Sequence, residues 1–260
     1  MAAVAELAAP DGRARSGRLA LADGARTTVH VACHDAARTE VRVAVLPAPQ
    51  RLEAWCAARG VREALVGGFF TRPSGSPLGE IRTHGVARAH APFAAPWDRS
   101  RACVHVEGGR PQIVPRDWLP RRPRGDLLQA GPLLVAGGER TCFAGVDPEG
   151  FAAASHQFDS DITQGRHPRA ALGLAAGRIV AVACDGRSRA DAGLTLAELA
   201  WLMVALGCEE ALNLDGGGSA SLVSGGRLRN APRKDFDVPE PGGRAIPTAL
   251  EFHPVSPRRA

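Results

Sequence analysis

Hydrophobic and polar residues alternate over several short runs of the chain, and alternation of this kind predicts β-strands. Single strands are expected at residues 17–21, 28–33, 40–45, 80–89 and 245–252. Other runs come in pairs around glycine-containing turns and predict hairpins at residues 102–114, 131–143, 170–184 and around 224–226. The repeated strand–turn–strand pattern therefore indicates a sheet that is built largely from hairpins.

Two segments predict helices. Residues 52–59 form a short run that ends at Gly60, a residue type that often follows a helix in the left-handed conformation. The second begins at Thr195, where the spacing to Glu198 is that of a capping box and apolar residues then recur every three or four positions up to residue 206. Because strands outnumber helices, we expect an α+β fold: one domain over residues 17–255, with a mixed, largely antiparallel sheet packed by a few helices. Residues 1–16 are expected to be a flexible N-terminus.

Residues 211–223 carry the most informative pattern. Apolar residues alternate with Asn213 and Asp215, so these two side chains should share one face at the end of a short strand. Three glycines and a serine follow: Gly216, Gly217, Gly218 and Ser219. The glycines remove every side chain beside the carboxylate and leave backbone N–H groups accessible. This arrangement suits an oxyanion or sugar hydroxyls, and the alternative is a glycine-rich turn with a solvated aspartate.

A second aspartate precedes a glycine at Asp185, after the apolar run 178–184. If the strands that end at Asp185 and Asp215 neighbour each other, the two carboxylates face a common cleft, and paired carboxylates are the usual groups for glycoside hydrolysis. Arg169 lies on the approach to the other strand of the Asp185 hairpin and is suited to hold a phosphate through two parallel hydrogen bonds. Glu198 is a further candidate, although its place in the capping box gives it a structural role as well. A surface turn or surface ion pair is the alternative for each.

Composition narrows the function classes. The net charge is +5, but the basic residues are scattered and no basic helix with interleaved aromatics is present, which disfavours nucleic-acid binding and fits an anionic small molecule. The six cysteines form no Cys-x-x-Cys pair and lie mostly in apolar runs, so buried free thiols are expected. No zinc, EF-hand, P-loop or serine-hydrolase motif occurs, so we predict neither metal nor cofactor. No signal peptide or 18-residue apolar run is found, so no membrane association and a cytoplasmic location are expected.

The sequence Asn-Leu-Asp-Gly-Gly-Gly-Ser at residues 213–219 resembles the signature of the phosphodiester glycosidases. Other segments fit the same family: 67–70 (Gly-Gly-Phe-Phe), 131–135 (Gly-Pro-Leu-Leu-Val), 169–173 (Arg-Ala-Ala-Leu-Gly), 185–187 (Asp-Gly-Arg) with the helix after it, and 243–250. The resemblance covers about residues 65–252. The chain departs from the family at Gly67, where the family has Asn, and at Ala170, where it has Thr.

The resemblance implies hydrolysis of the bond between a sugar C1 and a phosphodiester oxygen, which yields a free sugar and a phosphate monoester. It implies that Asp215 acts near the anomeric carbon, with Asp185 or Glu198 as the second carboxylate. The implied substrate-binding residues are Arg169, Asn213, Gly216, Gly217, Gly218, Ser219, Arg187, His156 and Gly68. Two alternatives remain open: a non-catalytic protein that binds a phosphorylated sugar or nucleotide sugar, and a phosphodiesterase that attacks phosphorus. The oligomeric state is not predicted.

Overall fold

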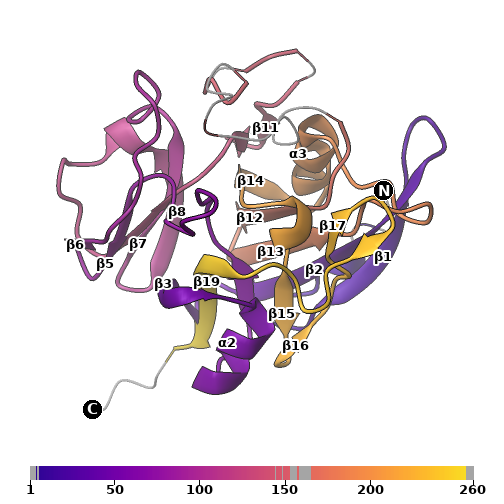
Figure 1. Cartoon of the computed structure of the whole chain (residues 1–260), viewed down its shortest axis with the longest axis horizontal. Coiled ribbons are helices and arrows are strands. Elements are labelled where there is room, and N and C mark those ends of the chain that lie inside the picture. Colours follow the sequence, from indigo (N-terminus) through magenta and orange to yellow (C-terminus); the bar gives the residue numbers. More distant parts are fainter. Residues whose placement is uncertain are drawn as a thin grey trace.

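Three antiparallel sheets organise the chain (Figure 1). The computed structural model describes residues 4, 6–143, 145–147, 149–152, 157 and 165–255. The large sheet has the strand order β1 (Arg15–Ala20), β2 (Arg26–Asp35), β13 (Arg178–Cys184), β12 (Arg169–Ala175), β14 (Cys208–Asn213), β10 (Leu133–Ala136) and β11 (Glu139–Arg140). Its centre is the β12–β13 hairpin, which the sequence predicts, with β14 paired to the other side of β12.

Two five-stranded sheets lie beside the large sheet. The second sheet has the order β16 (Arg227–Leu228), β15 (Leu222–Ser224), β4 (Ala64–Val66), β19 (Ile246–Pro254) and β3 (Thr39–Gln50). The third has the order β6 (Val86–Ala87), β5 (Ile81–Thr83), β9 (Asp126–Gln129), β7 (Ala102–Glu107) and β8 (Arg110–Pro115), and it forms one side of the molecule in Figure 1. A separate two-stranded hairpin consists of β17 (Arg233–Asp235) and β18 (Val238–Pro239).

The described residues form two α-helices, α2 (Leu52–Arg59) and α3 (Leu196–Ala205), and three short 3-10 turns at Glu6–Ala8, Arg116–Trp118 and Gly217–Ser219. Helix α2 has the predicted bounds and ends at Gly60 with φ of 69°. Helix α3 begins with the predicted capping box. None of the helices in the described parts of the chain is long and apolar enough to cross a membrane.

The large sheet is buried on both faces. On one face, Val180 and Val182 of β13 belong to a core with Leu199 and Leu202 of α3. On the other face, alternating residues such as Ala181 join a core shared with the second and third sheets. Burial on both sides explains why these strands read as continuous apolar runs. All six cysteines are buried with free thiols, as the apolar runs predict, and burial raises the pKa of the Cys103 thiol to about 12.

The fold differs from the sequence prediction in three respects. Every pairing between named strands is antiparallel, so the sheets are not mixed, and the fold is mainly β. The predicted strand 80–89 is the short hairpin β5–β6, because the chain turns at His84 and Gly85, which both have positive φ. The polar segment 230–243, in which no strand is expected from the sequence, contains the β17–β18 hairpin. Before β1, Leu7 packs into the core on the α3 side.

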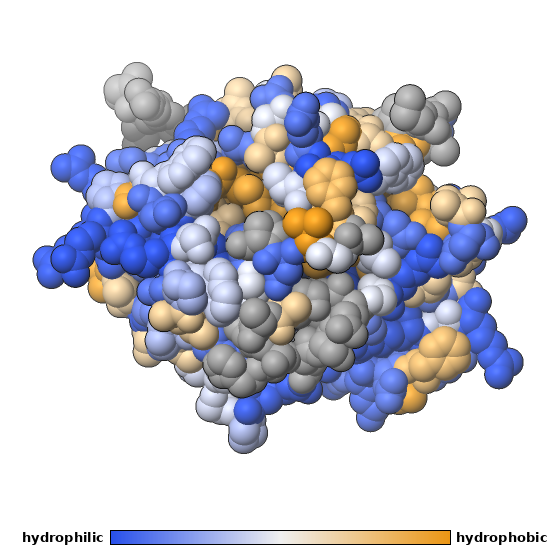
Figure 2. All heavy atoms as spheres, turned by 90° about the horizontal axis from the view of Figure 1, so that it is seen from above, coloured by the Kyte–Doolittle hydropathy of each residue, from blue (hydrophilic) through white to orange (hydrophobic). Residues whose placement is uncertain are grey.

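One face of the molecule is mostly polar. On the face seen in Figure 2, hydrophilic residues predominate and hydrophobic ones form small groups. Isolated exposed apolar residues of this kind are normal for globular proteins.

Candidate active site

Strand register brings three of the predicted site residues to one face of the large sheet. Asn213 lies opposite Ala171, and Leu214 N–H donates to the Ala170 carbonyl over 2.9 Å, which continues the pairing of β12 and β14. One step further along this register, Asp215 lies across from Arg169. Residues directly opposite in antiparallel strands project to the same side, and Ala171 belongs to the core on the α3 side. Arg169, Asn213 and Asp215 therefore share the α3 face of the sheet end.

Asp215 lies immediately after β14 and is half-buried. Its backbone N–H donates to the Gly67 carbonyl over 3.1 Å, which ties the end of β14 to the end of β4. Its Oδ1 accepts a 2.9 Å hydrogen bond from Gly216 N–H. The carboxylate is thereby positioned by backbone groups on rigid elements, as a group that acts on a substrate needs to be.

Asn213 is almost completely buried, and its Nδ2 donates to the Gly131 carbonyl over 2.8 Å. Neither Asn213 Oδ1 nor the hydroxyl of buried Ser219 has a hydrogen-bond partner among the described residues. A buried polar group without a partner costs about 1–3 kcal/mol, so its retention requires a reason. Hydrogen bonding to ligand hydroxyls is such a reason beside a half-buried carboxylate.

At each glycine of the triplet, an added side chain would come too close to a neighbouring group. A Cβ at Gly216 would lie 2.8 Å from the Pro168 carbonyl oxygen. Gly217 has φ of 57°, and a Cβ there would lie 3.0 Å from Arg187 Nη1. A Cβ at Gly218 would lie 3.2 Å from Arg244 Nη2. The three glycines therefore let two arginines and the chain at Pro168 approach the backbone closely. A turn that only reverses the chain direction does not require such close approach.

Arg169 is buried at the start of β12, where its Nε donates to the Leu194 carbonyl over 3.1 Å. Its Nη2 donates to the Gly165 carbonyl over 3.4 Å. These bonds to the segments before β12 and before α3 fix the direction of the guanidinium. Arg169 thus holds a positive charge on the same face as Asp215.

The structure separates Asp185 from Asp215. Strand β12 lies between β13 and β14, so the condition that the two strands are neighbours is not met. Asp185 follows Cys184, which faces α3, and its Oδ2 contacts Nε2 of His30 over 3.0 Å on the opposite face. Its Oδ1 accepts from Ala231 N–H over 2.6 Å. Both oxygens of this buried carboxylate therefore hold neighbouring segments in place, and its catalytic role stays a prediction.

Glu198 makes the hydrogen bonds of the capping box and also binds Arg166. Its carboxylate accepts from Thr195 N–H over 2.9 Å and from Arg166 Nε over 3.1 and 3.0 Å. Burial alone raises the pKa of Glu198, but the hydrogen bonds from Arg166 and Thr195 outweigh it and hold the pKa below its ordinary value. The structure thus places Glu198 at the start of α3 as an ionised cap, and a catalytic role for it also stays a prediction.

A cavity of about 670 Å³ lies beside the triglycine loop. Arg187 lines it and packs against Gly217, and His167 lines it one residue before Pro168, whose carbonyl accepts from Gly217 N–H over 2.8 Å. Arg187 has φ of 56°, a left-handed conformation that is uncommon for a residue other than glycine and that is concentrated at functional sites. Contacts through Arg187 and Pro168 therefore place the cavity next to the triglycine loop, and we consider the two together as the candidate site.

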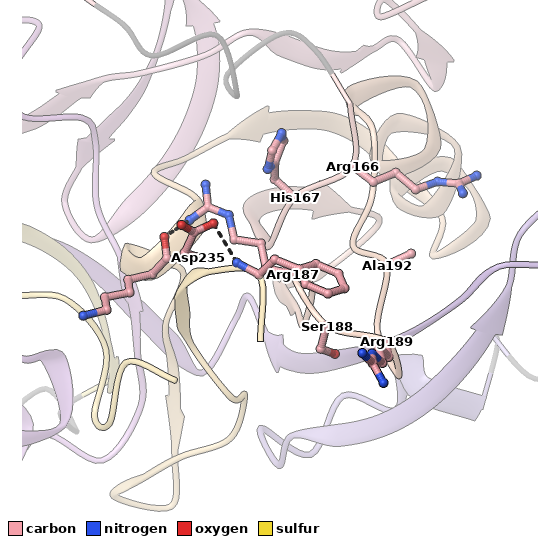
Figure 3. A pocket seen from close by; sticks show the side chains of 9 residues that line it. Arg166, His167, Arg187, Ser188, Arg189, Ala192 and Asp235 are labelled. Carbon is pink, nitrogen blue, oxygen red and sulfur yellow. Dashed lines mark hydrogen bonds between the residues drawn. The ribbon is translucent and has the colours of Figure 1, made fainter. Parts of the chain in front are cut away.

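The β17–β18 hairpin is fastened to this arginine. Arg187 Nη1 donates to the carbonyls of Lys234 (2.8 Å) and Arg233 (3.3 Å), and Asp237 N–H donates to the Arg187 carbonyl over 2.7 Å. Figure 3 shows Arg187 and Asp235 side by side in the cavity, while Arg166 extends away from Arg187. Among the described residues, no group of three or more His, Cys, Asp or Glu side chains lies together in a way that could hold a metal ion.

Comparison with known proteins identifies the family. The model of the phosphodiester glycosidase family matches residues 59–253. The chain belongs to the phosphodiester glycosidase family. The match includes the Asp215 loop, the Arg187 cavity and all of α3, so the candidate site lies inside the family domain.

Two solved structures share the fold of this phosphodiester glycosidase family member. The zebrafish N-acetylglucosamine-1-phosphodiester α-N-acetylglucosaminidase catalytic domain, auto-inhibited by its pro-peptide, superposes with a TM-score of 0.68 at 20% identity, over 92% of this chain and 82% of that one. A hypothetical protein from Synechocystis gives 0.62 at 18% identity, over 92% and 61%.

A curated relative is similar over a shorter segment. The SPbeta prophage-derived uncharacterized protein YomE of Bacillus subtilis (strain 168) is 38% identical over 142 residues, which are 53% of this chain. The matched part spans 20% of the length of that relative.

The two departures from the family motifs have structural explanations. A Cβ at Gly67 would lie 2.8 Å from the backbone carbonyl of Thr248, so an Asn side chain does not fit between β4 and β19 here. Ala170 is fully buried in the core shared with the second sheet, on the face opposite Arg169. Neither position therefore adds a side chain to the candidate site.

The remaining predicted residues have mixed outcomes. Gly68 lies just after β4, where a Cβ would be 3.1 Å from the Gln129 carbonyl oxygen. His156 lies outside the described residues. Three residues that line the cavity, Arg189, Lys234 and Phe236, were not predicted from the sequence. Lys234 and Phe236 lie in the segment 230–243, whose prolines, charged residues and closing glycines are typical of a loop.

Proposed function

We propose that this family member hydrolyses the glycosidic C1–O bond of a sugar-1-phosphodiester and releases a free sugar and a phosphate monoester. The observation that carries the proposal is the half-buried Asp215 carboxylate on one sheet face with Arg169 and Asn213, beside a cavity that Arg187 lines. A carboxylate next to fixed cations suits a substrate in which a sugar carbon must react beside an anionic phosphate. The name of the zebrafish relative, which specifies a 1-phosphodiester substrate, supports the same class.

Asp215 is proposed to act at the anomeric carbon. Water attacks C1 while the bond from C1 to the bridging phosphate oxygen breaks, and the electron pair remains on the phosphate. A carboxylate activates the water or stabilises the oxocarbenium-like transition state. Asn213 Oδ1 and the Ser219 hydroxyl are proposed to bind sugar hydroxyls.

Arg169 and Arg187 are proposed to stabilise the departing phosphate. A phosphate monoester is a better leaving group than an alcohol, so fixed cations replace much of the work of a general acid. This accounts for a site in which the other two candidate carboxylates, Asp185 and Glu198, are engaged in structural hydrogen bonds. Asp215 is then the catalytic carboxylate of the site.

Hydrolysis in ¹⁸O-labelled water tests the reaction. The proposal expects the label in the free sugar. Label in the phosphate product would instead assign attack on phosphorus, and absence of turnover with every sugar phosphodiester would assign a binding protein.

Substitution Asp215→Asn tests the central residue. Because the amide can neither activate water nor carry negative charge, kcat should fall by about 10²–10⁴-fold while the melting temperature changes little. Asp117→Asn is the matched control, because Asp117 is exposed and distant from Asp215 in the sequence. This variant should keep wild-type turnover. Wild-type turnover in a folded Asp215→Asn variant would show that the assignment is wrong.

A further inference from the structure

Three neighbouring strands of the large sheet place a serine, a histidine and an aspartate on one face. Strands β1, β2 and β13 lie side by side (Figure 1), and Ser16 of β1 lies directly opposite His30 of β2. Val29 and Val31, on either side of His30, belong to the core on the α3 side, so Ser16 and His30 project from the other face. Asp185, just after β13, contacts His30 on that same face.

The three side chains form a continuous hydrogen-bonded chain. Ser16 Oγ lies 2.8 Å from Nδ1 of His30, and the other ring nitrogen, Nε2, lies 3.0 Å from Asp185 Oδ2. His30 and Asp185 are buried, whereas Ser16 is exposed. A hydroxyl, a base and a carboxylate that orients the base, linked in this order, is the arrangement that activates serine nucleophiles, and it is recognised by geometry rather than by a sequence motif.

Asp185 determines which nitrogen of His30 carries the proton. An ionised carboxylate can only accept hydrogen bonds, so Nε2 carries the hydrogen and Nδ1 presents its lone pair to the Ser16 hydroxyl. The other carboxylate oxygen accepts from Ala231 N–H over 2.6 Å, which holds the aspartate in the orientation that faces the ring. His30 is therefore oriented to take a proton from Ser16.

The serine lies at an edge of the sheet. Strand β1 is the outermost described strand on its side of the large sheet. The N–H groups of such a strand point alternately toward the neighbouring strand and away from it. Either the N–H of Ser16 itself or those of Arg15 and Gly17 therefore point outward. N–H donors this close to the hydroxyl are suited to bind the oxyanion that forms when a serine attacks a carbonyl.

The family does not account for this chain of side chains. Ser16 and His30 precede residues 59–253, which match the family model. A structural role of Asp185 requires only its bond to His30, and the exposed hydroxyl on the remaining ring nitrogen is not needed for it. The position of Ser16 is explained instead if its hydroxyl reacts.

We propose that Ser16 is an activated nucleophile and that the protein hydrolyses carboxylic esters at this second site. Ser16 Oγ attacks the acyl carbon, and its proton passes to His30 Nδ1. The ester C–O bond then breaks, and His30 returns the proton to the departing alcohol. Water attacks the resulting acyl-serine with the help of the same base, which yields a carboxylic acid and restores the hydroxyl. Asp185 acts through His30 as a positioning residue.

A fluorophosphonate probe tests the wild-type protein directly. Ser16 Oγ should displace fluoride from phosphorus, and mass spectrometry should find the phosphonyl group on Ser16. The labelled protein should no longer hydrolyse p-nitrophenyl acetate. Ser16→Ala should abolish both labelling and hydrolysis, whereas Ser74→Ala, at an exposed serine in a turn, is the matched control and should keep both.

Two further variants test the base and its orientation. His30→Gln should lower the labelling rate by about 10²–10⁴-fold. In Asp185→Asn, the amide can keep its oxygen on Ala231 N–H and turn its NH₂ toward Nε2, which moves the ring proton to Nδ1 and removes the lone pair that faces Ser16. Labelling should therefore fall, and ¹⁵N NMR of the ring should show the proton on Nε2 in wild type and on Nδ1 in the variant.

The outcomes are separate from those for the proposed glycosidase. The inference is wrong if wild-type Ser16 is not labelled, if His30→Gln is labelled at the wild-type rate, or if Ser16→Ala still hydrolyses the ester. Asp215→Asn should keep both the labelling and the ester hydrolysis, because its carboxylate belongs to the other site. Loss of both in a folded Asp215→Asn variant would also overturn the inference of a second site.

Discussion

Gly217 illustrates how much a single position decides in this site. Its φ of 57° and the Arg187 guanidinium at 3.0 Å from an added Cβ both oppose a side chain. Gly217→Ala should therefore lower the free energy of unfolding by about 1–2 kcal/mol, because a left-handed conformation is unfavourable for alanine, and should displace Arg187. We expect KM to rise about tenfold, the loss of one good charged contact.

Gly225→Ala is the matched control for Gly217→Ala. Gly225 has φ of 65°, but nothing lies within 4 Å of an added Cβ. It should show the same loss of stability, measured by chemical denaturation, with KM unchanged. Equal KM values for the two variants would argue against Arg187 as a substrate-binding residue.

At the residue scale, the sequence predicted some neighbours and not others. Asn213 and Asp215 could be placed together because the period of a strand is two, and that placement holds whatever the strand pairs with. The separation of Asp185 from Asp215 could not be predicted, because it depends on β12 lying between β13 and β14. The resemblance names Arg187 as a substrate-binding residue, but its contacts could not be predicted, since they depend on the chain returning at Lys234.

At the scale of an element, the contacts of Glu198 at the start of α3 predict how its substitution changes stability and turnover. Glu198→Gln should lower the free energy of unfolding by about 1–2 kcal/mol through the weakened cap and the lost ion pair with Arg166, while kcat stays within about threefold of wild type. Glu139→Gln, on an exposed strand residue, is the control. A large loss of kcat with an unchanged melting temperature would make Glu198 catalytic after all.

The stability difference between wild type and Glu198→Gln should decrease as the pH falls. Because the folded pKa of Glu198 is lowered, its contribution is fully present above the unfolded value of about 4.3 and is lost as the pH falls through the folded value. Wild type and Glu198→Gln should therefore converge in stability in acid.

Elements with local signals were predictable, and elements without them were not. Helix α2 and the hairpins around Gly177 and Gly225 follow from apolar periodicity and turn glycines that neighbour each other in sequence. The β17–β18 hairpin has no apolar alternation, because its residues are mostly exposed. It is held instead by Arg187, and the chain just before it is held by Asp185 through Ala231 N–H. Its stability comes from tertiary contacts that a local pattern does not contain.

At the scale of the whole molecule, His34 links two sheets. Its ring in β2 stacks on Phe252 of β19 with centroids 4.6 Å apart, and burial lowers its pKa to about 4. Since an unfolded histidine has a pKa near 6.5, the unfolded chain binds the proton more readily between these values. Stability should therefore be full above about pH 6.5 and fall by about 3 kcal/mol as the pH drops to about 4.

His34→Phe keeps the stacked ring and removes the titration. Denaturation from pH 4 to 8 should show a flatter stability profile than wild type in the window from 4 to 6.5, with similar stability at pH 7. An identical slope in both proteins would place the acid sensitivity elsewhere.

The arrangement of the sheets could be predicted least well from the sequence. The strands that pair within the second sheet, such as β3 with β19, lie some 200 residues apart in the chain, and a local pattern carries no information on such pairing. The expectation of one sheet thus became three, although the hairpins and the antiparallel sense within them were predicted.

The place of the β17–β18 hairpin in the fold affects how the candidate site can vary among relatives. It belongs to none of the three large sheets and lies between β16 and β19 in the chain. Its sequence and length can therefore change without disturbing the register that aligns Arg169 with Asp215. Because the hairpin also holds Arg187 through two backbone carbonyls, exchanging it among relatives would change the surroundings of that arginine while the sheet that carries Asp215 stays in place.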